Sequence, residues 1–195
     1  LDTATTGTIT ASIDTDETVT ELKTLTGTTH AYTIVIAAGD ATSSSADDLN
    51  TINEKTTAAI NASAITALTS DTIDNIKTLL TAGNDTDQFT ATSFASLTGV
   101  TVSDETLDGS KLADAIDQAN SATGDTSVVF TISAANTIEG SEANFTALLT
   151  DDGNNQIDID DQDISVSGTI SVDNANLLDT ATTGTITASI DTDET

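Results

Sequence analysis

A verbatim repeat dominates this sequence of 195 residues. Residues 1–18 and residues 178–195 both read LDTATTGTITASIDTDET, so they match at every position with an offset of 177 residues. Chance does not produce such a match, and a long internal repeat constrains the fold more than any local pattern does. The sequence therefore predicts one full repeat unit over residues 1–177, followed by residues 178–195 as the start of the next identical unit.

A shorter phrase recurs within the long unit: a helical pattern, then in most cases a glycine, then an alternating strand. Apolar residues spaced by three and four predict short helices around residues 19–25, 49–52, 73–80, 112–116, 145–149 and 177–178. The side chains expected to cap these helices at their N-termini are Asp16, Ser45, Ser70, Asp108, Ser141 and Asp173. The glycines expected at helix C-termini, where a left-handed residue is common, are Gly27, Gly83, Gly124, Gly153 and Gly184.

Alternation of apolar and polar residues predicts six strands, at residues 8–13, 32–37, 59–64, 89–94, 129–134 and 156–160. Their expected inward side chains are Ile9, Ala11, Ile13, Ile34, Ile36, Ile60, Ala62, Phe89, Ala91, Phe130, Ile132, Ile157 and Ile159. The longest interval between strands indicates an insertion around residues 98–110, and a further short strand signal occurs at residues 167–173. One unit thus holds six helix–strand phrases.

Helices that alternate with strands favour parallel strand pairing through crossover connections. A single phrase has too little apolar surface to enclose a core, so neighbouring phrases must stack on one another. We therefore predict an α/β tandem-repeat solenoid with a parallel β-sheet on one side, short helices on the other side, and about six coils in each 177-residue unit. The alternatives are an array of all-β immunoglobulin-like modules, which the recurring helices disfavour, and a compact α/β globule for each unit.

The charge of the chain limits its partners. Acidic side chains number 32 and basic side chains 4, which gives a formal net charge of −28. Nucleic acid is not expected as a partner because phosphate binding requires a basic surface, whereas divalent cations are expected. No apolar stretch approaches the roughly 20 residues that span a bilayer, so membrane insertion is not expected either. Cysteine is absent, which excludes disulfides and thiolate metal sites.

No catalytic constellation stands out in the sequence. His30 is the single histidine, and its surroundings, GTTHAY, contain no pattern typical of an activated nucleophile. We interpret His30 as a solvent-facing turn residue and expect no enzymatic activity. Each lysine is expected to pair locally with a nearby acid, such as Glu21 or Glu54; the lysines are Lys23, Lys55, Lys77 and Lys111.

The segment 151–163, DDGNNQIDIDDQD, is the strongest chemical signal. Calcium prefers clustered oxygen ligands, although this segment does not have the ligand spacing of an EF-hand loop. One interpretation is a calcium site in which Asp158 and Asp160 point outward from a strand and are joined by Asp152, Asp161 or Asp163. The other interpretation is a solvated acidic turn that binds no ion.

Two phrases resemble repeats of a known class of protein. Residues 46–69 (ADDLNTINEKTTAAINASAITALT) and 174–191 (NANLLDTATTGTITASID) look like repeats of giant Thr- and Asp-rich tandem-repeat cell-surface proteins of cyanobacteria, such as those needed for swimming. The resemblance implies a secreted, very long protein of the cell surface or matrix. It carries over no catalytic residue.

Together these observations predict an extracellular or cell-surface structural protein, built from head-to-tail copies of one unit. The expected function is a long stiff fibre, stalk or sheath filament. The alternative is a spacer region of a giant calcium-dependent adhesin whose binding domain lies elsewhere in the protein. A third hypothesis is lateral bundling of filaments through hydroxyl-bearing strand faces or calcium bridges.

Overall fold

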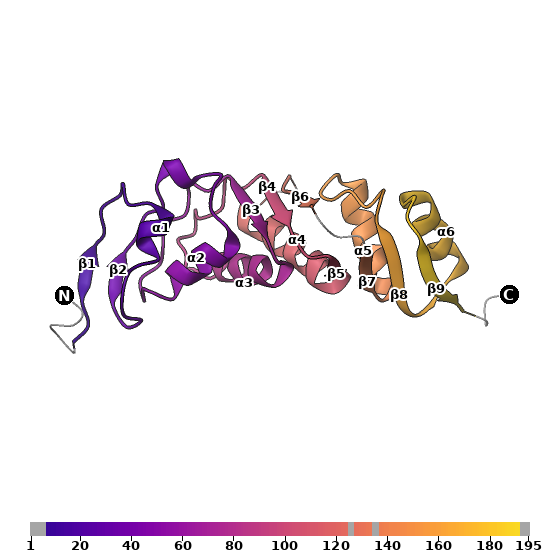
Figure 1. Cartoon of the computed structure of the whole chain (residues 1–195), viewed down its shortest axis with the longest axis horizontal. Helices are drawn as coiled ribbons and strands as arrows, with labels where there is room; N and C mark the ends of the chain where they lie inside the picture. The colour runs from indigo at the N-terminus through magenta and orange to yellow at the C-terminus, as the bar shows by residue number, and fades with distance from the viewer. Residues whose placement is uncertain (1–6, 125–126, 134–136, 192–195) are drawn as a thin grey trace.

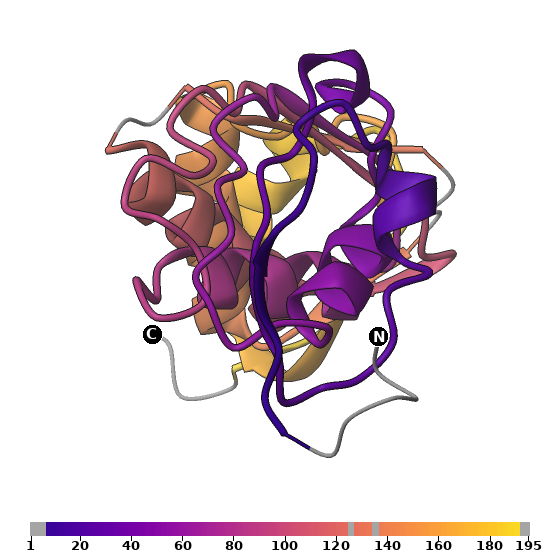
Figure 2. The same ribbon diagram turned by 90° about the vertical axis from the view of Figure 1, so that its left-hand side faces the viewer.

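The computed structural model describes residues 7–124, 127–133 and 137–191. These residues form an elongated molecule whose elements follow one another along the long axis, with β1 (Thr10–Ser12) near one end and β9 (Ile186–Ile190) near the other (Figure 1). Viewed along that axis, ribbons from the whole length of the chain overlie one another (Figure 2). The two partial copies of the repeat therefore lie at opposite ends of the molecule.

The described residues contain six α-helices, nine strands and a short 3-10 helix, η2 (Ala38–Asp40). In chain order the other elements are β1, α1 (Val19–Leu22), β2 (Ala31–Thr33), α2 (Ala46–Asn53), β3 (Ala67–Asp71), α3 (Ile73–Gly83), β4 (Gly99–Val102), β5 (Thr106–Asp108), α4 (Gly109–Thr123), β6 (Val129–Ile132), β7 (Thr137–Gly140), α5 (Glu142–Gly153), β8 (Asp163–Ile170), α6 (Val172–Ala181) and β9.

All strand pairs in the described residues are parallel, which confirms the predicted α/β class and its parallel pairing. The strands form three sheets, with the orders β1-β2, β3-β4-β6 and β5-β7-β8-β9, so the prediction of one sheet along one side is wrong. Neighbouring strands lie about 4.8 Å apart, whereas packed helices need about 8–10 Å. Six helices packed side by side therefore occupy a greater length than one strand per helix in a single sheet, which accounts for the division into separate sheets.

The helices stack in chain order, and each contacts the next from α1 to α6. Their apolar faces and the inward residues of the strands form one core cluster that includes residues from Val19 to Leu178. The largest fully buried side chains are those of Phe89, Phe94, Phe130 and Phe145. Burial of apolar surface between neighbouring helices and strands is thus the main stabilising interaction along the axis.

Half of the predicted helix caps are confirmed, namely Ser45, Asp108 and Ser141. The other three helices begin two residues away from the prediction, after a hydroxyl side chain that accepts a hydrogen bond from the first helical turn. These caps are Thr18, Thr72 and Ser171, in place of Asp16, Ser70 and Asp173. Of the glycines, Gly124 is a left-handed C-cap with φ +68°, as predicted. The other four do not occupy the C-cap: Gly83 and Gly153 are the last residues of their helices, and Gly27 and Gly184 lie beyond the ends of theirs.

The observed strands differ from the predicted ones more than the helices do. The supposed insertion at residues 98–110 contains β4 and β5, and β3 and β7 were not predicted. Residues 89–94 form one isolated bridge at Phe89 and then a turn, in which Phe94 has φ +61° and Ala91 is exposed. Residues 59–64 and 156–160 likewise contribute isolated bridges rather than strands. Residues 172–173 begin α6 instead of ending a strand.

Candidate functional site at the repeat junction

The duplicated segment forms a strand in both of its copies, and the two strands have different neighbours. In the first copy, β1 pairs with β2, with Ala11 opposite Tyr32. In the second copy, β9 pairs with β8, with Ile186 opposite Ile164 and Ile190 opposite Ile170. Within the described residues, β1 has no strand on its other edge, and neither has β9. Each copy therefore shows one half of the surroundings of the same sequence.

The two copies form hydrogen bonds through alternate residues. In the first copy, the carbonyl of Ile9, directly before β1, accepts from Ala31 N at 2.8 Å, and the N–H of Ile13, directly after β1, donates to Thr33 O at 3.0 Å. In the second copy, the carbonyl of Thr185 accepts from Ile164 N at 2.9 Å, and Asp191 N donates to Ile170 O at 3.0 Å.

Thr185 and Asp191 correspond to Thr8 and Asp14, because the offset is 177 residues. Successive residues of a strand present their backbone groups to opposite edges. The bonds to β8 and the bonds to β2 therefore use different residues of the repeated segment, and one strand can form both sets at the same time.

The same side chains are covered to different extents in the two copies. Ile9, Ala11 and Ile13 are partly buried and pack against the core. In the second copy, Ala188 is exposed and Ile190 is 47% exposed. Val172 and Leu177 of α6 are also exposed, at 45% and 55%, so three of the four large exposed hydrophobic side chains in the described residues lie near this end, the fourth being Val129 of β6. The C-terminal end of the stack thus presents apolar side chains beside a strand edge.

His30 takes part in the contact between β1 and β2. It is 4% exposed, its Nδ1 accepts the backbone N–H of Ile9 at 3.1 Å, and its ring packs edge-on against Tyr32 with centroids 5.4 Å apart. The interpretation of His30 as a solvent-facing turn residue is therefore wrong. The GTTHAY pattern did not reveal its burial, because the partner on which it depends is 21 residues away.

The start of the second copy rests on the acidic segment that precedes β8. The Thr182 hydroxyl donates to the carbonyl of Gln162 at 2.6 Å and accepts from Gly184 N at 2.9 Å. A Cβ atom on Gly184 would lie 2.2 Å from the carbonyl oxygen of Gln162. Only glycine allows this backbone approach. The repeated sequence therefore needs a glycine at this position for its contact with the preceding coil.

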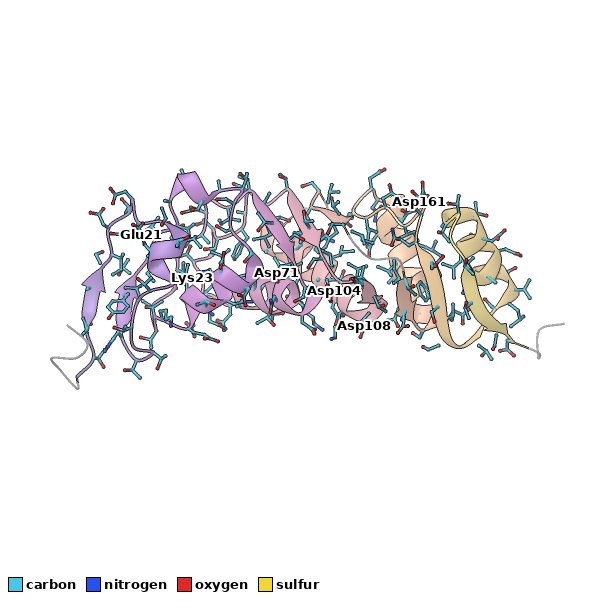
Figure 3. All side chains as sticks on the ribbon, viewed as in Figure 1. Glu21, Lys23, Asp71, Asp104, Asp108 and Asp161 are labelled. Atoms are coloured by element: carbon cyan, nitrogen blue, oxygen red, sulfur yellow. The ribbon has the colours of Figure 1, made fainter. Side chains whose placement is uncertain are left out.

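The five predicted metal ligands separate into two groups. Asp152, Asp158 and Asp160 come together, with one carboxylate oxygen of each within 4.8 Å of the others. Asp161 accepts from the Thr183 hydroxyl at 3.1 Å, and Asp163 accepts from Thr185 N at 2.6 Å. Asp161 and Asp163 therefore bind the second copy of the repeat, and Figure 3 places Asp161 near the last coils of the molecule.

The triad of Asp152, Asp158 and Asp160 opens into a depression of about 650 Å³, which Asn155 and Gln162 also line. Asp158 and Asp160 lie in a turn closed by a hydrogen bond from Asp160 N to Asp158 Oδ1, instead of on the predicted strand. Burial raises the pKa of Asp152, and the charges of Asp160 and Asp158 raise it further. Clustered carboxylates that repel one another in this way can hold a divalent cation, which removes the repulsion.

Several acids cap the N-termini of helices that lie earlier in the chain, a role that the sequence did not reveal. The carboxylates of Asp40, Asp71 and Asp104 each accept a backbone N–H from the first turn of a helix 21–31 residues earlier in the chain. Figure 3 shows Asp71 and Asp104 in the middle of the stack. Negative charge at a helix N-terminus is favourable, so each of these acids joins a helix to a segment that follows it in the chain. A single sequence gives no signal for these pairs, because the partners are distant along the chain.

Lysine and amide side chains also connect neighbouring coils. Lys77 pairs with Asp114 at 2.6 Å and Lys111 pairs with Asp74 at 2.7 Å, so two ion pairs cross between α3 and α4. Lys23 pairs with Asp48 of α2. The prediction of local pairs for these three lysines is therefore wrong. Asn120 and Gln156 form a similar bridge, in which Gln156 Nε2 donates to Asn120 Oδ1 at 2.6 Å.

None of the helices in the described ranges is both long enough and apolar enough to cross a membrane. Comparison of the chain with protein-family models found no match, and searches of curated proteins and of solved structures found no significant similarity.

Proposed function

We propose that the 177-residue unit stacks head to tail into a continuous α/β solenoid, and that this solenoid serves as a structural fibre. In this proposal, the strand formed by residues 186–190 lies between β8 of its own unit and the β2 of the following unit. One strand then belongs to two units, and the junction is built like any other step between coils. The fibre is a stalk, sheath or matrix filament whose length depends on the number of copies.

The use of alternate residues by β1 and β9 carries this proposal. Ile9 and Ile13 bond to the following strand, whereas Thr185 and Asp191, the counterparts of Thr8 and Asp14, bond to the preceding strand. If units were separate globules, their shared sequence would not need complementary hydrogen bonds on both of its edges. Side-chain burial supports the same arrangement, since Ile13 is covered where β2 is present and Ile190 is exposed where no such strand follows.

The remaining features fit a structural protein outside the cell. Asp40, Asp71 and Asp104 cap helices, and Asp74 and Asp114 pair with lysines of the neighbouring helix, which gives these five acids a role in stacking. The net charge of −28 keeps separate filaments apart in solution. The resemblance of residues 46–69 and 174–191 to repeats of giant cyanobacterial surface proteins points to the same location. We propose no enzymatic activity and no binding to nucleic acid.

Small-angle X-ray scattering of chains with one, two and three copies of the unit tests the continuous stack. A stiff stack predicts a cross-sectional radius that stays constant and a maximum dimension that grows by the same increment with each copy. Flexibly joined globules predict slower growth, because the end-to-end distance of a flexible chain increases with about the square root of its length. The second pattern would contradict the proposal.

A second candidate, favoured by the Asp152, Asp158 and Asp160 triad, is a calcium-dependent spacer within a larger adhesin. Asn155 and Gln162 line the same depression, and the side-chain oxygen of Gln162 is buried without a hydrogen-bond partner among the described residues. Oxygen ligands of these types are those that Ca²⁺ prefers. Binding at this place would brace the acidic segment on which Thr182, Thr183 and Gly184 of the next copy rest.

Calorimetric titration with Ca²⁺ tests this second candidate. We expect binding to the unaltered chain, loss of binding in Asp158→Asn, and little change in Asp161→Asn, since Asp161 lines the depression but lies outside the triad. Equal affinities in all three proteins would show that Ca²⁺ associates only with the diffuse negative charge.

A further inference from the structure

We propose that separate copies of this chain join end to end by strand exchange: residues 184–191 of one copy replace residues 7–14 of the next copy beside β2. This proposal rests on the continuous stack described above and adds a partner, namely a second copy of the same chain. Exchange of an identical element between chains is a low-cost route to assembly, because it creates few contacts that the single chain does not already contain.

The acceptor is the edge of β2 together with His30. The first copy of the segment pairs with β2 over residues 10–12. At the two ends of this pairing, further hydrogen bonds run from Ala31 N to Ile9 O, from Ile13 N to Thr33 O, and from Ile9 N to His30 Nδ1. All three use backbone groups of Ile9 and Ile13, and the side chains of these residues are partly buried against the core. Ile186 and Ile190 have the same spacing within an identical sequence, so they offer the acceptor the same atoms.

The donor is the edge of β9 that faces away from β8, where no strand of the described residues lies. Its bonds to β8 use Thr185 and Asp191, which leaves the alternate residues Ile186, Ala188 and Ile190 directed at the opposite edge. That edge carries an exposed Ile190, and Leu177 of the preceding helix is 55% exposed. An open strand edge with apolar side chains is a ready template for pairing with another chain.

The resulting joint has the same strand contacts as the junction proposed between covalently linked units. When residues 184–191 of the first copy replace residues 7–14 of the second, Ile186 and Ile190 occupy the positions of Ile9 and Ile13 beside β2. The incoming β9 forms with β2 the same kinds of hydrogen bonds that β1 formed there before it left. The additional gain is the burial of the donor's Leu177 and Ile190 against the acceptor chain. Because each chain has a net charge of −28, this association needs salt to screen the repulsion.

Matched substitutions at one repeat position separate exchange from general aggregation. Ile13→Asp weakens the packing of residues 7–14 against β2 of the same chain. Ile190→Asp places a charge on the exposed side chain of β9 that must be buried against the β2 of another chain. We expect Ile13→Asp to raise the dimer association constant about tenfold or more in roughly 0.5 M salt, and Ile190→Asp to lower it by a similar factor. The variant with both substitutions should be monomeric. Size-exclusion chromatography with light scattering measures these constants.

Two outcomes of that experiment would overturn the proposal. One is an Ile13→Asp variant that is folded by circular dichroism and yet no more associated than the unaltered chain. The other is equal association of Ile13→Asp with and without Ile190→Asp, because exchange needs the donor. Failure of either kind leaves the scattering result for covalently joined copies untouched, so it is distinguishable from failure of the proposed fibre.

A peptide experiment on the unaltered chain covers the case in which Ile13→Asp does not fold. The chain is refolded from urea with an excess of a labelled peptide, LDTATTGTITASIDTDET, and then separated from free peptide. We expect the peptide to be retained beside β2 and to shorten any oligomers, because it fills the acceptor without extending the stack. The same peptide with Asp at both isoleucine positions should not be retained. Equal retention of the two peptides, or of neither, would contradict the exchange.

Discussion

The strands β1 and β9 lie within two copies of the same segment, Ile-Thr-Ala-Ser-Ile, at opposite ends of the molecule (Figure 1). β1 is held by the coil that follows it, through Ala31 and Thr33, whereas β9 is held by the coil that precedes it, through Ile164 and Ile170. The sequence is constant, so the difference in burial between Ile13 and Ile190 comes entirely from neighbouring coils. Each copy of the segment thus pairs on one edge only within the described residues, and the two copies together show partners for both edges.

The largest expected difference between the two copies comes from their glycines. Gly184→Ala places a Cβ atom 2.2 Å from the backbone oxygen of Gln162, and overpacking of this kind costs about 1–3 kcal/mol. Gly7→Ala changes the same repeat position in the first copy, where Gly7 is exposed, and should cost about 0.5 kcal/mol or less. Urea denaturation of the two variants measures both values. Equal costs would show that the contact with residue 162 is not what demands glycine.

Truncation of the last isoleucine in each copy of the segment, Ile13 or Ile190, should give a smaller difference in the free energy of unfolding. Ile13→Ala removes a partly buried side chain and is expected to lower the free energy of unfolding by about 1–2 kcal/mol. Ile190→Ala removes one that is 47% exposed and should cost about 0.5 kcal/mol or less.

A longer chain sharpens this test of the isoleucines. If residues 19–53 of the repeat are added after residue 195, Ile190 acquires the coil that covers Ile13. The cost of Ile190→Ala should then rise to that of Ile13→Ala. An unchanged cost would mean that the added coil does not pack on β9.

A pH-dependent effect is expected in the coil that supports β8 and β9. Burial raises the pKa of Asp151 in α5 to about 6, and the charge of Asp117 contributes. A carboxyl whose pKa is raised on folding destabilises the folded state when it is ionised, so the cost is complete above about pH 6 and vanishes below its unfolded pKa. Asp151→Asn should therefore stabilise the protein by about 1–2 kcal/mol at pH 8, after allowance for solvent screening, and have almost no effect near pH 3.5.

Thermal unfolding at the two pH values measures this difference. Asp179→Asn, which changes an exposed carboxylate of α6, is the control and should shift the melting temperature little at either pH. Equal behaviour of Asp151→Asn and Asp179→Asn at pH 8 would show that Asp151 is adequately solvated in the folded state.

The smallest expected effect concerns Glu142, which lies at the other end of α5. Hydrogen bonds from Ser171 and Asn174 at the start of α6 lower the pKa of Glu142. A depressed carboxyl pKa contributes stability that is present above the unfolded pKa and is lost as the pH falls through the folded pKa. Glu142→Ala should therefore lower the melting temperature slightly at pH 7 and less at pH 3. A uniform loss at both pH values would indicate that packing, rather than charge, is the main contribution.

Local patterns in the sequence predicted the helices better than the strands. The caps Ser45, Asp108 and Ser141 and the left-handed Gly124 were predicted correctly, because a helix start and a helix end are defined by residues close together in the chain. Strands of three to five residues carry too few alternations to be distinguished from turns. At residues 89–94 the alternating pattern masked a turn in which both Ser93 and Phe94 are buried.

The residues of the candidate site were likewise predictable only where their partners are close in the sequence. Asp152, Asp158 and Asp160 lie within nine residues of each other, and their clustering follows from the end of α5 and one turn. By contrast, the partners of Asp71 and of His30 are determined by which coil lies next to which. No pattern in one copy of the unit identifies such partners. Only the second copy of the segment shows which atoms the repeated strand offers to the coil before it.

Amide hydrogen exchange at one repeat position tests the shared strand most directly. In the 195-residue chain, the amide of Ile13 donates to Thr33 and should exchange slowly, whereas the amide of Ile190 faces the open edge of β9 and should exchange quickly. In a chain of two complete units, the amide of residue 190 should become as protected as that of residue 13, because the β2 of the second unit then lies beside it. An amide of residue 190 that still exchanges quickly in the two-unit chain would show that the sheet stops at the junction, and the continuous solenoid would be wrong.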